Sequence, residues 1–227
     1  MEWAAEVGRR STRALVALVI AVVAVAGVAL VGGQDAGAAK KKAAKVSDAT
    51  MTWAVSNYVL TANPATLSVA EVHNAEAPAT FADGTGWTFT DGKGTYDTKT
   101  GATTIAYPGA LEFGNTSRGN YAFKFANPTF VLDASGTGTL TADVSLRPAG
   151  ASAYNAASQI VVLNITGATP TKSKNHVEVT AAPTAFSDPL FTATADLASH
   201  FRASGSSNDP NKPPAPIKVA FDYKAKK

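Results

Sequence analysis

Short runs in which apolar and polar residues alternate fill the chain from about residue 50 onward, and they favour β-strands over helices. The runs at 140–147 and 217–224 each place an apolar residue at every second position. Successive side chains of a strand point to opposite faces, so each run can bury one face and leave the other in water. We count roughly ten candidate strands, which is too many for one small open sheet and suits two packed sheets.

Turn-forming dipeptides separate these runs and predict where strands end. Gly, Asn, Asp and Pro favour turns because they tolerate positive φ, bond their own backbone or lack a backbone donor. Such pairs occur at 83–84, 91–92, 108–109, 127–128 and 135–136. Apolar residues at helical spacing also predict a helix over residues 188–203. The sequence therefore predicts an all-β domain over residues 50–223, an antiparallel β-sandwich with one or two short helices.

The first 38 residues have the pattern of a signal peptide. Three arginines precede an apolar run of 18 residues at 14–31, and the small residues at 36 and 38 suit cleavage after Ala38. We therefore expect export by general secretion and a location in the cell envelope or outside the cell. The alternative is an uncleaved membrane anchor, because the run is close to the length that crosses a bilayer.

Basic residues gather at the two ends of the exported part. A lysine-rich linker at 39–49 and a basic tail at 224–227 hold seven lysines, more than the formal net charge of +3, so the domain between them is net negative. Nucleic-acid binding needs a basic face on the folded domain, and we expect no nucleic-acid partner. The lysine ends either contact anionic polymers and lipids of the envelope or are simply solvated.

Few residues suit catalysis or metal binding. The chain has no cysteine and only three histidines, at 73, 176 and 200. This excludes thiolate metal sites, cysteine nucleophiles and disulfides, and it argues against a histidine-rich metal site. The sequence also lacks a nucleophile elbow, a phosphate-binding loop and a dinucleotide fingerprint. We therefore expect a protein that is not an enzyme.

Six motifs follow one another from the start to the end of the domain. They are an opening tryptophan at Trp53, G-x-Y-D-x-x-T-G at 94–101, G-x-x-x-F at 109–113, N-P at 127–128, L-x-A-D-V at 140–144 and G-x-x-x-D-P at 205–210. Most of these residues have turn or strand chemistry, so they specify a scaffold. Together they resemble the HtaA domain, the haem-binding module of actinobacterial cell-envelope haem-uptake proteins.

The resemblance implies haem as the cofactor and a tyrosine as the ligand of its iron. In the family this tyrosine follows the opening tryptophan, and a histidine after the G-x-x-x-F motif bonds its oxygen. The family spacing falls on Ala62 here, so the nearest tyrosine, Tyr58, is the candidate ligand of the haem iron. Asn115 stands where the family has its histidine.

Strand periodicity adds an expectation about Tyr58. Met51, Trp53 and Val55 share one face of a predicted strand, so a continuing strand would turn Tyr58 away from the core, where it could line a pocket. His73 is the candidate second pocket residue, because the family builds its pocket from the segment after this tyrosine. The alternatives are an ordinary half-buried tyrosine and a histidine at a strand end.

The leading hypothesis is an exported, non-enzymatic HtaA-like domain that binds or relays haem at the cell envelope. Its expected partner is haem or a haem-donor protein. The second hypothesis is a structural or adhesive envelope module that keeps the HtaA-like scaffold without haem. The asparagine at 115 and the altered tyrosine spacing keep this second hypothesis open.

Overall fold

The computed structural model of the chain describes residues 43–56, 59, 72–115, 121–183, 185–193 and 213–224. Within these residues the protein is almost entirely antiparallel β-sheet, with twelve strands and one short helix. The strands are β1 (Ala44–Trp53), β2 (Val72–Glu76), β3 (Thr80–Ala82), β4 (Gly86–Tyr96), β5 (Thr103–Ala106), β6 (Ala110–Asn115), β7 (Tyr121–Leu132), β8 (Gly138–Arg147), β9 (Ser158–Ile165), β10 (Thr169–Ser173), β11 (His176–Ala181) and β12 (Ile217–Lys224). The helix is α2 (Asp188–Ala193). The predicted all-β class is confirmed.

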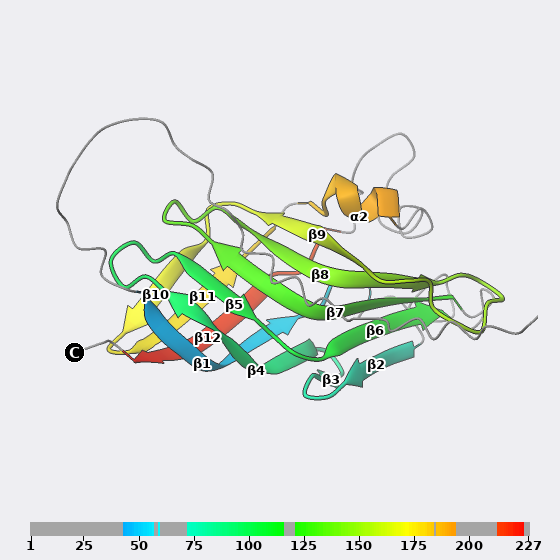
Figure 1. Cartoon of the computed structure of the whole chain (residues 1–227), viewed down its shortest axis with the longest axis horizontal. Helices are drawn as coiled ribbons and strands as arrows, with labels where there is room; N and C mark the ends of the chain where they lie inside the picture. The colour runs from blue at the N-terminus through cyan, green and yellow to red at the C-terminus, as the bar shows by residue number, and fades with distance from the viewer. Residues whose placement is uncertain are drawn as a thin grey trace, which may run out of the picture. The chain divides into compact units, whose positions relative to one another are not determined.

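The strands form one continuous sheet that folds into two layers (Figure 1). One layer has the order β10-β11-β12-β1-β4-β3, and the other has the order β2-β6-β7-β8-β9. β5 joins the layers, because it pairs with the end of β4 on one side and with the second half of β7 on the other. Figure 1 shows β6 to β9 lying over β12, β1 and β4, which is the arrangement of a β-sandwich.

Aromatic rings from both layers fill the space between them. Trp53 of β1 stacks on Phe125 of β7 with ring centroids 5.9 Å apart, and Phe89 of β4 meets Tyr107 at 6.5 Å. All four side chains are almost completely buried. Each such ring removes roughly 150–250 Å² of surface from water. The inward positions of the alternating runs are therefore the core, as the strand periodicity predicted.

Two predicted turns are instead bulges inside longer strands. The Asn127-Pro128 pair was expected to end one strand and start another, but β7 continues through it. Asn127 has φ of 49°, the register of β7 with β8 shifts after Ala126, and the neighbour of β7 on its other side changes from β6 to β5. The Asp91-Gly92 pair lies inside β4 in the same way, with Asp91 at φ of 59°. An extra residue in one strand lets it bend and change partners without ending.

The boundaries of the domain differ in detail from those expected. β1 begins at Ala44, so residues 44–49 of the expected linker pair with β12 and β4.

α2 begins where the sequence predicted a helix, and the hydroxyl of Ser187 accepts the N–H of Leu190 at 3.3 Å as an N-cap. The rest of the predicted helix and the expected signal peptide lie outside the described residues. In the described part of the chain no helix has the length and apolar character needed to cross a membrane.

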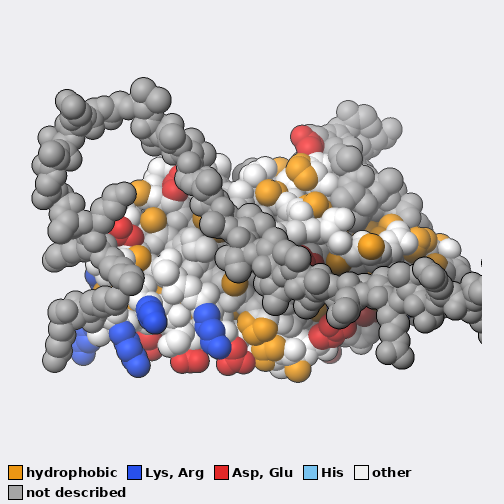
Figure 2. All heavy atoms as spheres, in the orientation of Figure 1, with side chains coloured by type: hydrophobic (Ala, Val, Ile, Leu, Met, Phe, Trp, Pro, Cys, Tyr) orange, Lys and Arg blue, Asp and Glu red, His pale blue; other side chains and the backbone are white. Residues whose placement is uncertain are grey.

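The exposed face of the first layer carries charges of both signs. Figure 2 shows basic and acidic side chains next to one another along the lower edge of the face in view. Exposed residues of β1 and β12 include Lys45, Asp48, Lys218, Asp222 and Lys224. This face therefore has no uniform basic surface of the kind that phosphate backbones select.

Candidate functional site

Four aromatic rings from four strands meet at one end of the sandwich, and we call them the His73 cluster. They are His73 of β2, Phe81 of β3, Trp87 of β4 and Phe113 of β6. His73 stacks on Phe81 at 4.7 Å between centroids and 17° between planes, and its ring meets Trp87 edge-on at 5.6 Å. Trp87 lies 4.8 Å from Phe81 and 6.3 Å from Phe113. Strand pairing produces this arrangement, because His73 is the register partner of Phe113 and Phe81 that of Trp87.

Hydrogen bonds to backbone carbonyls hold the two nitrogen-bearing rings of the His73 cluster. Trp87 donates Nε1–H to the carbonyl oxygen of Asn74 at 2.7 Å. Nε2 of His73 lies 3.2 Å from the carbonyl oxygen of Val59. A carbonyl only accepts, so this bond requires the ring proton of His73 to be on Nε2. Burial among the rings lowers the pKa of His73, because it disfavours the imidazolium cation.

Tyr58, the candidate iron ligand, lies outside the described residues. Its neighbour in sequence, Val59, is described and buried, and its backbone N–H donates to the carbonyl of Ser56 at 2.9 Å. The carbonyl of Val59 is the acceptor for His73. The structure therefore connects the residue after Tyr58 to the other predicted pocket residue, His73.

The expectation that strand alternation continues from Trp53 to Tyr58 is wrong. β1 ends at Trp53, and Val55 has φ of 62°, which is outside the β region. Ala54, Val55 and Ser56 are all buried, so neither face of this segment points to solvent. Ser56 donates its hydroxyl to the carbonyl of Pro213 at 2.8 Å, which fastens the segment to the approach to β12. Periodicity therefore says nothing about the orientation of Tyr58.

Of the remaining candidate residues, His176 lies away from the His73 cluster. Asn115 is the last residue of β6 and pairs with Tyr121 of β7. His176 lies on the exposed face of the first layer, where its Nδ1 is 2.9 Å from the carboxylate of Asp222. His200 is outside the described residues. Among the residues that the structure describes, no group of three or more His, Asp or Glu could hold a metal ion.

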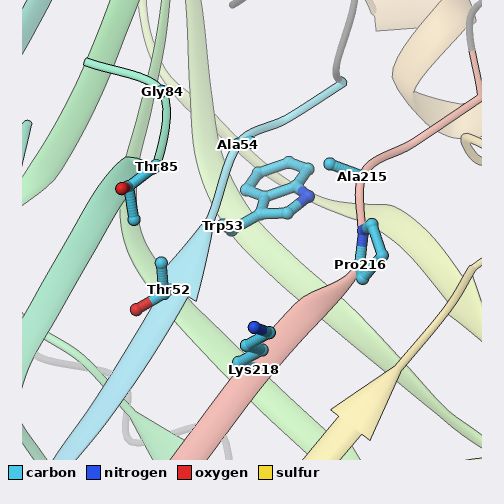
Figure 3. A pocket seen from close by; sticks show the side chains of 8 residues that line it. All are labelled: Thr52, Trp53, Ala54, Gly84, Thr85, Ala215, Pro216 and Lys218. Carbon is cyan, nitrogen blue, oxygen red and sulfur yellow. The ribbon is translucent and has the colours of Figure 1, made fainter. Parts of the chain in front are cut away.

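A cavity of about 320 Å³ opens at the end of β1 (Figure 3). Its lining comes from the end of β1, the turn before β4 and the start of β12: Thr52, Trp53, Ala54, Gly84, Thr85, Ala215, Pro216 and Lys218. The indole nitrogen of Trp53 is buried and has no hydrogen-bond partner. Sequence reasoning missed this cavity, because Lys218 has the pattern of any exposed lysine on an alternating strand. Only the shape of the folded surface distinguishes it.

Comparison with known proteins gives the family of this fold. The HtaA family model, described as Htaa, matches residues 48–197, which is more than half of the chain. The chain belongs to the HtaA family. This family is associated with haem uptake. No curated protein matches the chain.

Two solved structures resemble this HtaA-family chain. The crystal structure of the C-terminal domain of HtaA from Corynebacterium glutamicum superposes with a TM-score of 0.61 and 18% identity, over 80% of this chain and 99% of that domain. A domain-swapped dimer of a histidine-to-alanine variant of the same domain superposes with a TM-score of 0.49 and 20% identity, over 65% of this chain and 81% of that chain. At this identity, the first likeness establishes the shared fold.

The HtaA motifs lie mainly in the scaffold of the domain. The turn at 97–101 between β4 and β5 is held by Asp97, whose carboxylate accepts the N–H of Lys99 at 2.8 Å and that of Thr100 at 3.1 Å. The motif at 109–113 forms the start of β6, and the motif at 140–144 lies within β8. These positions explain why the motifs identify the fold better than they identify a binding site.

The described residues fit a haem pocket in part. The His73 cluster supplies apolar, aromatic surface and one histidine with a fixed proton, which suits the wall of a porphyrin pocket. Nε2 of His73 is engaged by the carbonyl of Val59, which leaves Nδ1 as the ring nitrogen that carries the lone pair.

Proposed function

We propose that this HtaA-family protein is an exported, non-enzymatic module that binds or relays haem at the cell envelope. Tyr58 would hold the iron, and the His73 cluster would form the adjoining wall of the pocket. The observation that carries the proposal is the hydrogen bond between His73 and the carbonyl of Val59, which ties the chain next to Tyr58 to four packed aromatic rings.

The chemistry of the two residues supports their roles. A phenolate oxygen is a hard anionic ligand that favours ferric iron. With its proton on Nε2, the neutral His73 ring has its lone pair on Nδ1, which can accept the proton of a phenol. Burial keeps His73 neutral by lowering its pKa, so the ring retains this lone pair near neutral pH. When bound, haem would supply the iron centre that the module carries.

A haemin titration of the chain, followed by the Soret band, tests the proposal. We expect a saturable band at one haem per chain that is lost in Tyr58→Phe, because this variant removes only the ligating oxygen. Tyr96→Phe is the matched control, since Tyr96 lies at the opposite end of β4 from Trp87 of the His73 cluster. His73→Ala should weaken binding but keep the band.

Each result of this titration separates the alternatives. A band that survives Tyr58→Phe moves the ligand elsewhere, and the same titration of His73→Ala then tests that residue as the ligand. Unchanged haem affinity in His73→Ala would remove His73 from the pocket. No saturable band in the unmodified chain would refute haem binding altogether.

Asn115 favours a second candidate function, a structural or adhesive envelope module that keeps the HtaA scaffold without haem. It stands in the position of the family histidine, and its amide cannot act as a base toward a phenol. If the titration shows no haem binding, this module becomes the better proposal. The Asn115→His variant would then test whether the missing side chain is the reason.

A further inference from the structure

We propose that one end of the sandwich, where β1 begins and β12 ends, docks on a lipid bilayer that contains anionic lipids. We call it the basic end, and its described lysines are Lys45, Lys99, Lys174 and Lys224. From the sequence, the lysines at the two ends of the domain either contact the envelope or are solvated. Strand pairing favours contact, because it collects these lysines at one place. The proposal does not rest on haem binding.

The pairing of β1 with β12 brings the two lysine-rich segments together. Lys45 and Lys224 are register partners in these antiparallel strands, whose backbones lie about 4.8 Å apart. The other five lysines of the two segments follow or precede them closely in sequence, at 40–42, 226 and 227. Because each residue extends a chain by at most about 3.6 Å, all five lie within about 18 Å of Lys45 or Lys224. Both segments therefore contribute to one concentration of positive charge.

Lys45 and Lys224 face each other with no acid between them. Both side chains are exposed, and within the described residues no ion pair joins either of them to an acid. The neighbour of Lys45 on the other side, Thr95 of β4, is neutral. Like charges directly opposite each other on paired strands are destabilising. An anionic partner would relieve this repulsion.

Two turns add exposed lysines to the basic end. Lys99 lies in the turn that follows β4, and the end of β4 pairs with the start of β1. Lys174 lies in the turn between β10 and β11. Its carbonyl accepts the hydroxyl of Tyr223 at 3.2 Å, which places this turn beside the end of β12. The lysines of the basic end therefore come from both chain segments and from two turns.

Two acids of the basic end already have partners. Asp222, which precedes Lys224 by two positions, lies 2.9 Å from Nδ1 of His176. Asp97 accepts the backbone N–H groups of its own turn. In Figure 2 the basic side chains in view lie over the half of the molecule where β12 ends in Figure 1. The seven lysines of the two segments outnumber these acids, so the basic end is net positive.

A bilayer suits the basic end better than a single anionic polymer does. Its lysines are spread across β11, β12, β1 and β4, a width of about 15 Å for adjacent strands. A planar surface can meet all of them at once, whereas one polymer chain requires cations aligned along a row or groove. Each lysine close to an anionic bilayer raises the affinity roughly fivefold. The expected export also brings the domain to the outer surface of a membrane.

Docking by the basic end would point the His73 cluster away from the bilayer. Trp87 of this cluster lies at the start of β4, whereas Thr95, the partner of Lys45, lies at its end. The intervening strand spans about 25 Å. The proposed haem pocket would then face the outer part of the envelope.

The test is cosedimentation of the chain from Ala39 onward with phosphatidylcholine vesicles, prepared with and without about one third phosphatidylglycerol. This chain keeps every described strand, since β1 begins at Ala44. We expect binding only to the vesicles that contain phosphatidylglycerol. The affinity should fall at least tenfold between about 0.1 M and about 1 M salt, because the screening length drops from about 10 Å to about 3 Å.

Lys224→Glu and Lys218→Glu are a matched pair of variants, because both make the same charge change on the same face of β12. Lys218 lies about 20 Å from the basic end, which is about two screening lengths at 0.1 M salt. Lys224→Glu should lower the affinity for the anionic vesicles about 30-fold, since it changes two unit charges. Lys218→Glu should lower it by no more than about threefold. Lys224→Glu should keep the fold, because its carboxylate would face Lys45.

The outcomes separate docking from general attraction. Equal losses in the two variants would show that only the net charge matters, and the basic end would not be the docking surface. Equal binding to both kinds of vesicle would also overturn the proposal. A chain that ignores the vesicles but binds soluble polyphosphate would have an anionic polymer as its partner in place of a bilayer. Vesicle binding is measured without haemin, so its failure and the failure of haem binding are distinguishable.

Discussion

Gly92 lies beneath the ring of Tyr107, and alanine at this position tests how tightly the two layers pack. A Cβ at residue 92 would lie 2.4 Å from Cε1 of Tyr107 and 3.0 Å from Cβ of Ala49. Carbon atoms in contact normally lie about 3.5–4.0 Å apart, so the ring must move by about 1 Å. It has little room to do so, because Tyr107 is buried, meets the ring of Phe89 and donates its hydroxyl to the carbonyl of Thr50 at 3.4 Å.

Overpacking of this kind costs about 1–3 kcal/mol, so Gly92→Ala should lower the free energy of unfolding by that amount. Tyr107→Val removes the ring and should itself cost about 2–4 kcal/mol through the cavity that it leaves. In the double variant the added methyl group occupies part of this cavity. The double variant should therefore be more stable than the sum of the single effects predicts, by roughly 1 kcal/mol.

Urea unfolding followed by tryptophan fluorescence gives the free energy of unfolding of the unmodified chain, the two single variants and the double variant. These values can be compared when the slope of the free energy against urea concentration is the same in all four proteins. The reasoning is refuted if the two changes add to within about 0.5 kcal/mol, because independent sites behave in this way. It is also refuted if Gly92→Ala leaves stability unchanged.

The remaining predictions concern two histidines and one turn. An NMR titration should give His73 a pKa below 6.5, because burial disfavours its cation. The same titration should give His176 a pKa above 6.5, because its ring bonds the carboxylate of Asp222. The reverse order of the two pKa values would contradict both assignments. Since the folded-state pKa of His176 is raised, its stabilising effect is complete below the unfolded-state pKa and is lost as the pH rises through the folded value. His176→Gln should therefore lower the urea midpoint at about pH 5 and have little effect at about pH 8. For His73 the sign is opposite, so stability should fall as the pH drops below 6.5, and His73→Phe should reduce this acid sensitivity. Asp97→Ala should lower the urea midpoint, because the backbone N–H groups of Lys99 and Thr100 lose their acceptor. Asp97→Asn keeps a side-chain oxygen at this place and should retain most of the stability. Equal losses in the two variants would show that the turn does not depend on the side-chain oxygen of residue 97.

Strand periodicity predicted most of the fold but misread two bulges. The inward positions of β8 and β12, such as Leu140 and Val219, are buried as the alternation indicated. Asp91-Gly92 and Asn127-Pro128 have turn chemistry, yet both lie inside strands. A residue with positive φ serves a turn and a bulge equally well, and only the neighbouring strands decide between them. Asn127 forms a bulge because β7 pairs with β6 before it and with β5 after it.

The candidate site was predictable only in part, because its residues come from different strands. His73 was singled out from the sequence through the family resemblance, but nothing in its surroundings along the chain indicated Phe81 or Trp87 as partners. Likewise, Thr52 and Lys218 are far apart in sequence and line the same cavity only through the pairing of β1 with β12.

The sequence by itself determined the β class, the turn at Asp97 and membership of the HtaA family. These properties depend on local information, because alternation and turn chemistry act over a few residues. The tertiary structure decided the order of the strands, the change of partner along β7, the His73 cluster and the cavity beside Trp53. Each of these results from pairing between segments distant in the chain, and such pairing is selected by the packing of the whole core rather than by any one segment.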